Sequence, residues 1–127
     1  MEVIASSKGV RISPRKVRLV ADSIRKMSAE KALGVLSQIE KRGAYPLIKT
    51  LKSAVANAVN KGLNKDSLFI KSLEVMEGQA LKRYHPSSRG RTHPYKRKSS
   101  HIKIVLSDNQ SQISNVKSQI KKKEGKK

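Results

Sequence analysis

The residues best suited to chemistry lie between Glu77 and Asp108, a stretch without a single acidic side chain. It contains all three histidines of the chain, His85, His93 and His101. It also contains eight cations, which are Lys82, Arg83, Arg89, Arg91, Lys96, Arg97, Lys98 and Lys103. Such a segment cannot neutralise its own charge, so it needs a polyanionic partner, and nucleic acid is the commonest one.

Other kinds of chemistry find little support in the sequence. The histidines are eight residues apart and have no carboxylate nearby, which disfavours a zinc site, and the chain has no cysteine for disulfides or Cys-based zinc sites. No Asp/His pair is adjacent to Ser13, to Ser28 or to the Ser87-Ser88 pair, which disfavours a nucleophilic triad, and no Gly-rich phosphate loop occurs. Enzymatic function is disfavoured by these absences, and we expect no metal and no cofactor.

Composition indicates the broad class of the protein. The chain has 127 residues and a net charge of +20, from 29 Lys+Arg against 9 Asp+Glu. It has no Trp and one Phe, which disfavours base stacking on aromatic platforms and favours contacts to phosphates. No apolar run is long enough to span a membrane, and the N-terminus does not resemble a secretory signal. We expect one small, soluble, cytoplasmic domain that does not bind membranes.

Three helices are predicted in the first half of the chain. Ser13 followed by Pro14 is typical of a helix start, and Ser28 is a typical cap of a second helix. Gly43, after Lys41 and Arg42, is expected to end that second helix. A third helix runs from about 45 to 61, and its buried stripe is predicted to consist of Ile48, Leu51, Val55 and Ala58.

The first helix carries its cations opposite a predicted buried face. That face is formed at helical spacing by Val17, Val20, Ala21 and Ile24. One interpretation of the opposite side is a solvated charged surface. RNA contact is favoured instead, because Asp22 alone balances the surrounding cations. These cations are Lys8, Arg11, Arg15, Lys16 and Arg18.

Three strands are expected beside these helices. Residues 3–5 form a short β-prone run, and residues 67–77 form a strand whose alternation changes phase near Lys71, which predicts a β-bulge. Residues 100–107 alternate between apolar and polar side chains. The last two strands pair as a hairpin whose arms of about 12 residues reach about 40 Å, at ~3.3 Å per residue. Pro86, Gly90 and Pro94 predict an irregular distal end.

The predicted fold class is α+β, with three helices packed on a small three-stranded antiparallel sheet and a long, protruding, basic β-hairpin. Residues 1–109 are expected to form a single domain that includes the extended hairpin at 78–103, and residues 110–127 a Lys-rich flexible tail. On the hairpin, the expected nucleic-acid-binding residues are Lys82, Arg83, His85, Arg89, Arg91, Lys96, Arg97, Lys98 and His101.

Several segments resemble the universal large-ribosomal-subunit protein twenty-two family of the bacterial type. The similar segments are 13–22 for the first helix of that family, 54–58 for its third helix, 81–91 for its hairpin motif and 96–102 for its returning strand. The resemblance covers about residues 2–108, and the hairpin motif is its most specific part.

The resemblance implies a structural constituent of the large ribosomal subunit that binds large-subunit rRNA and helps subunit assembly. It would be a monomer within the ribosome, beside neighbouring ribosomal proteins. The resemblance also implies that the hairpin tip lines the nascent-peptide exit tunnel and contacts the nascent peptide. The tip residues are Ser87, Ser88, Arg89, Gly90, Arg91, Thr92 and His93.

An alternative from another class is a DNA-compacting, nucleoid-type protein, which could also present a basic β-ribbon arm with prolines at its tip. Such an arm would imply a dimer, and the sequence shows no apolar surface large enough for one.

Overall fold

The computed structural model describes residues 1–108, and at its centre lies a sheet of three antiparallel strands in the order β1-β5-β2. Strand β1 spans Glu2–Val10, β2 spans Leu68–Glu77 and β5 spans Ser100–Asp108. Strand β5 pairs with both neighbours. Strand β1 extends beyond the predicted residues 3–5 because its pairing with β5 continues, through an irregularity after Ser7, as far as Val10.

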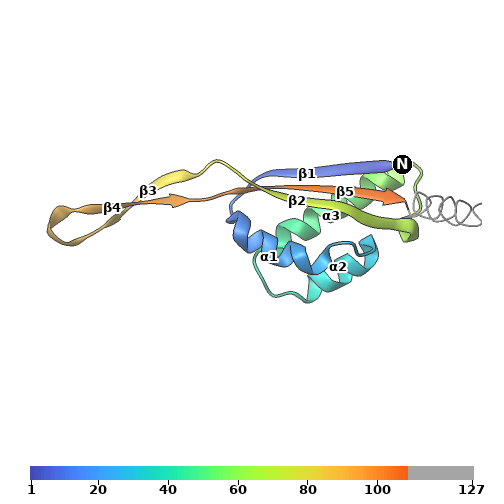
Figure 1. Ribbon diagram of the computed structural model, residues 1–127, viewed down its shortest axis with the longest axis horizontal. Helices are drawn as coiled ribbons and strands as arrows, with labels where there is room; N and C mark the ends of the chain where they lie inside the picture. The colour runs from blue at the N-terminus through green and yellow to red at the C-terminus, as the bar shows by residue number, and fades with distance from the viewer. Residues whose placement is uncertain (109–127) are drawn as a thin grey trace, which may run out of the picture.

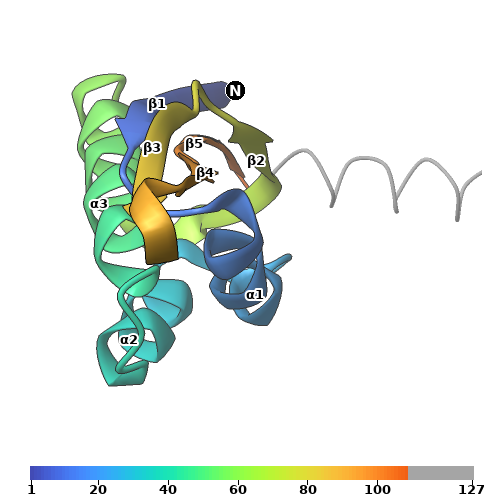
Figure 2. The ribbon, with the colours of Figure 1, turned by 90° about the vertical axis from the view of Figure 1, so that its left-hand side faces the viewer.

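Three helices pack against one face of this sheet (Figures 1 and 2). They are α1, Pro14–Ile24, α2, Ala29–Gln38, and α3, Ala44–Asn60. The face that they cover includes Ile102, Ile104 and Leu106 of β5, all of which are fully buried. The predicted α+β class, with three helices on a three-stranded antiparallel sheet and a protruding hairpin, is confirmed. The predicted tail at 110–127 lies outside the described residues.

Two predictions about the helices were wrong in detail. Helix α2 ends at Gln38, and Gly43 does not terminate it: Gly43 has a right-handed backbone conformation, with φ −69°, and directly precedes α3. In α3, the predicted Ile48 and Val55 are only partly buried, whereas Leu51 and Ala58 are fully buried as predicted. Because α3 packs between α2 and the sheet, close approach places the small Ala54 in the core, where hydrophobicity alone would have favoured Val55.

The predicted bulge in β2 is present, because the register of β2 against β5 shifts between Ile70 and Ser72. Lys71, in this bulge, forms an ion pair with Glu2 of β1. Since β1 and β2 are the two outer strands, the ion pair reaches across β5. The register places Ser107 of β5 beside Glu2, and its side chain is buried there.

Beyond the sheet, the chain continues as a two-stranded ribbon of β3, Leu81–Pro86, and β4, Thr92–Arg97 (Figure 1). Every residue of both strands is exposed, so no hydrophobic core supports the ribbon. The prolines lie within the paired ribbon, where Pro94 pairs with Tyr84 and Pro86 with Thr92. Each strand of a two-stranded ribbon has a free edge, and prolines are tolerated at edges.

The irregular part of the hairpin is therefore shorter than expected. It is confined to the tip, where Ser88–Gly90 form a short 3₁₀ turn. Arg89 and Gly90 adopt left-handed conformations there, with φ of 55° and 70°. The turn is closed by a hydrogen bond of 2.7 Å from the N–H of Ser87 to the carbonyl of Arg91.

Candidate nucleic-acid interface

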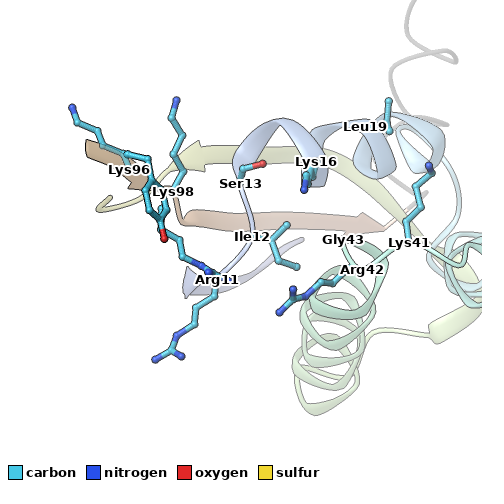
Figure 3. Close-up of a pocket in the computed structure, with 12 residues that line it drawn as sticks. Arg11, Ile12, Ser13, Lys16, Leu19, Lys41, Arg42, Gly43, Lys96 and Lys98 are labelled. Atoms are coloured by element: carbon cyan, nitrogen blue, oxygen red, sulfur yellow. The ribbon is translucent and has the colours of Figure 1, made fainter. Parts of the chain in front are cut away.

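A groove of about 570 Å³ lies where the base of the ribbon meets the helical body (Figure 3). Its walls come from the β1–α1 loop, helix α1, the α2–α3 turn, and the end of β4 with the residue after it. Seven lining residues are cations and none is acidic. We call this surface the basic groove, and its cations are Arg11, Lys16, Lys41, Arg42, Lys96, Arg97 and Lys98.

Gly43 allows the α2–α3 turn to approach helix α1 closely. A Cβ atom on this buried glycine would lie 3.1 Å from the carbonyl oxygen of Lys16 and 3.5 Å from Cγ2 of Val20. The carbonyl belongs to the backbone of a helix, so it cannot move aside without disturbing α1. The close approach brings Lys41 and Arg42 to the groove, and sequence reasoning missed both because it treated them as the end of α2.

The structure brings five of the predicted nucleic-acid-binding residues into the basic groove, namely Arg11, Lys16, Lys96, Arg97 and Lys98. The others lie outside it. They are Lys8 on β1, Arg15 and Arg18 on α1, Lys82, Arg83 and His85 on β3, Arg89 and Arg91 at the tip, and His101 on β5. The predicted residues thus fall into the groove, the cationic ribbon that leads away from it, and four further positions on β1, α1 and β5.

Arg18 is engaged by the body of the protein. Its Nε and Nη2 donate hydrogen bonds of 3.1 and 2.9 Å to the carbonyl oxygen of Val75 in β2. Arg25 makes a similar contact, in which Nη1 donates to the carbonyl of Leu73 at 3.2 Å. The two arginines therefore tie α1 to the outer strand β2, a structural role that the sequence pattern alone did not reveal.

The three histidines have separate surroundings. Nδ1 of His101 accepts a hydrogen bond of 2.9 Å from the backbone N–H of Gly9. The ring of His85 stacks on Tyr95, with centroids 4.1 Å apart, and Nε2 of His93 lies 3.1 Å from Oγ of Ser87. Within residues 1–108, no group of three or more His, Asp or Glu side chains is placed to hold a metal ion.

The two arms of the hairpin are joined where the sheet gives way to the ribbon. The N–H of Gly78 donates to the carbonyl of Ser99 at 2.9 Å, and Oγ of Ser99 donates to the carbonyl of Gln79 at 2.6 Å. A Cβ on Gly78 would lie only 2.5 Å from Oγ of Ser99. Nζ of Lys98 is 3.7 Å from Glu77, in an ion pair that is exposed and therefore weak. These contacts connect the ribbon to the sheet at a defined point.

The fold and the groove define a class of protein: a basic α+β body with a projecting cationic ribbon. None of the helices in residues 1–108 has the length and apolar character needed to cross a membrane. Residues 5–107 match the family described as "Ribosomal protein L22p/L17e".

Individual relatives agree with this match. The large ribosomal subunit protein uL22 of Thermus thermophilus is 50% identical over 109 residues, which cover 85% of this chain and 96% of that protein. The protein of the same name from Mesoplasma florum is 47% identical over 109 residues, which cover 85% of this chain and 97% of that protein. The chain therefore belongs to the ribosomal protein L22 family.

Family membership confirms the predicted resemblance and the predicted role as a structural, non-enzymatic ribosomal protein of the large subunit. Its location is accordingly the ribosome. The alternative of a DNA-compacting protein loses its support, because the family match covers nearly all of the described residues.

Proposed function

We propose that this chain binds large-subunit rRNA through the basic groove and the ribbon. The observation that carries this proposal is the concentration of seven cations, without a carboxylate, in one concave surface. Phosphates that enter the groove relieve the repulsion among these cations and release their own counterions, which favours binding. The same contacts would help the protein to join the subunit early in assembly.

The body and the ribbon are expected to contribute differently to this binding. Lys16 projects from α1, whose opposite face is packed into the core, so this cation is presented by a rigid element. The ribbon cations, such as Lys82 and Arg83, stand on exposed strands without a core beneath them. We therefore assign docking to the body and its groove, and longer reach into the subunit to the ribbon.

The tip of the ribbon is proposed to line the nascent-peptide exit tunnel and to contact the nascent peptide. The supporting observations are its position at the far end of the molecule and the exposure of nearly all its side chains (Figure 1). The proposed tunnel residues are Ser87, Ser88, Arg89, Gly90, Arg91, Thr92 and His93.

A salt titration with rRNA tests the role of the groove. A plot of log affinity against log salt has a negative slope, to which each neutralised phosphate contributes roughly 0.7–0.9. Replacing Lys16 and Arg42 with Ala should therefore reduce the magnitude of this slope by about 1.5. The matched control replaces Lys31 and Lys52, two exposed lysines outside the groove, and should leave the slope nearly unchanged. A flat salt dependence of the native protein, or equal slopes for the two double variants, would contradict the proposal.

A cross-linking experiment tests the tunnel assignment. A photoreactive amino acid at Arg89 should cross-link to a radiolabelled nascent chain in stalled ribosomes, and the same amino acid at Lys52 on α3 should not. Replacing residues 88–90 with Asn-Gly should retain the hydrogen bond from the N–H of Ser87 to the carbonyl of Arg91, because this dipeptide favours tight hairpin turns. That variant should still enter the subunit and should lose the tip contact. Failure to enter the subunit would show that the tip is needed for docking.

A further inference from the structure

The basic groove contains apolar side chains that phosphate binding does not require. Beside its cations, the lining includes Ile12, Leu19 and Tyr95. Leu19 is 63% exposed although the next residue of α1, Val20, is buried. In Figure 3, Ile12 lies in the middle of the groove, and Leu19 lies beside Lys41 at one end. The groove therefore combines an apolar lining with a cationic rim.

These two kinds of side chain are held together by the fold. Lys16 and Leu19 are three residues apart on α1, so they project from the same side of the helix. The close approach of Gly43 to the backbone of Lys16 then brings Lys41 and Arg42 to the same groove. Tyr95 enters from the ribbon, where it is partly covered by its stacking on His85.

An RNA duplex presents little apolar surface that could pack against such a lining. Its phosphates and 2′-hydroxyls face outwards, and its bases are stacked inside the helix. An unpaired nucleotide, by contrast, presents an apolar base face and a phosphate on the same unit. The groove volume of about 570 Å³ lies within the range of ~300–1,000 Å³ that is typical of sites for small organic groups.

We propose that the basic groove receives an unpaired RNA nucleotide, from a bulge or a loop. Its base packs against Ile12, Leu19 and Tyr95, and the phosphates on either side contact Lys16, Lys41 and Arg42. This inference rests on the proposed rRNA binding and specifies which RNA structure the groove selects. It also gives Leu19 a role that its exposed position on the helix otherwise lacks.

The test compares two RNA hairpins of equal stem length, one fully paired and one with a single-nucleotide bulge, by fluorescence anisotropy with the full chain. The native protein should bind the bulged RNA at least about fivefold more tightly, in line with the contribution of one base held against protein side chains. Leu19→Ser should bring this ratio close to one. It should leave the salt slope unchanged, because the substitution alters no charge.

Val59→Ser is the matched control, since Val59 is an exposed apolar residue of α3 outside the groove. It should keep the native preference for the bulged RNA, and thermal unfolding should show that both variants fold. Equal binding of the two hairpins by the native protein would overturn this inference but leave the proposed rRNA binding intact. Loss of the preference in Val59→Ser as well would also overturn it. Absence of salt-dependent binding to either hairpin would instead contradict the proposed function itself.

Discussion

The backbone N–H of Gly9 donates a hydrogen bond to Nδ1 of His101 at 2.9 Å, although 92 positions separate the two residues in the chain. Gly9 has a φ of 68° and lies in the irregular end of β1, close to the point where β1 and β5 part. His101 is the second residue of β5, just inside the junction with the ribbon. The hydrogen bond therefore connects the end of β1, an outer strand, to the base of the projecting hairpin.

Replacement of His101 by Ala should weaken this junction. The free energy of unfolding should fall by about 1 kcal/mol, because the Gly9 N–H loses its protein acceptor. The ribbon should also become less strictly oriented. Since the chain has no cysteine, spin labels at Lys52→Cys and Ser88→Cys can report the distance from body to tip, and its distribution should broaden. His93→Ala, at the exposed tip, should change neither quantity, and an unchanged distribution in His101→Ala would refute the role of the bond.

Replacement of Arg18 by Met should lower stability by about 1 kcal/mol, because it removes both donors to the carbonyl of Val75 and retains much of the apolar stem. Arg15→Met removes the same charge from the same helix, and its effect should stay within about 0.5 kcal/mol, as is usual for surface positions. Urea denaturation of both variants provides the measurement. Equal midpoints would mean that Arg18 does not stabilise the packing of α1 on β2.

Replacement of Gly43 by Ala should destabilise the protein by roughly 1–3 kcal/mol, because the new methyl group would press on the backbone of Lys16. Gly34→Ala is the natural comparison: Gly34 lies within α2 with nothing within 4 Å of its Cβ position, so the change should stabilise the helix by roughly 0.5–1 kcal/mol. Thermal unfolding should shift the two variants in opposite directions. If the Gly43→Ala variant unfolds at a higher temperature than the native protein, α1 and the α2–α3 turn can move apart at little energetic cost.

The ion pair between Glu2 and Lys71 should make stability depend on pH. The hydrogen bond and the charge of Lys71 lower the pKa of the Glu2 carboxyl below its ordinary value of 4.5. A lowered pKa in the folded state means that the stabilisation is present above about pH 4.5 and is lost as the pH falls through the folded-state pKa. Lys71→Met should therefore be less stable than the native protein at pH 7, and the difference should shrink in acid. For Lys31→Met, the difference in stability from the native protein should not depend on pH in this way. If the difference for Lys71→Met does not change with pH, the ion pair with Glu2 is not its cause.

Local features of the fold were predictable because neighbouring residues determine them. Ser13 is the N-cap residue of α1 and Pro14 is its first residue, a pairing that favours a helix start through local backbone geometry. The phase change near Lys71 reflects the two-residue period of a strand. The extent of the ribbon pairing was not predictable in the same way. Pro86 and Pro94 are compatible with β3 and β4 only because each strand has one unpaired edge, which is a property of the assembled ribbon.

The candidate site was predictable only in part, for a similar reason. The run of cations near Lys96 is visible in the sequence, and so are Arg11 and Lys16. The contribution of Lys41 and Arg42 depends on the contact between Gly43 and α1, which joins segments far apart in the chain. Sequence patterns show which residues are charged, but long-range packing decides which of them share a surface.

The position of β5 in the sheet has a consequence for how a newly made chain acquires its structure. Strands β1 and β2 each pair with β5, and β5 occupies residues 100–108. During translation α1, α2 and α3 emerge well before this strand, so their apolar faces stay uncovered until the sheet has formed. Pairing that depends on such distant segments is slow, and exposed apolar faces favour aggregation in the interval. A nascent chain that has reached only Gly90 already contains α1, α2 and α3, yet it lacks β5, which joins β1 to β2, so the sheet that covers these helices can form only after β5 has been made.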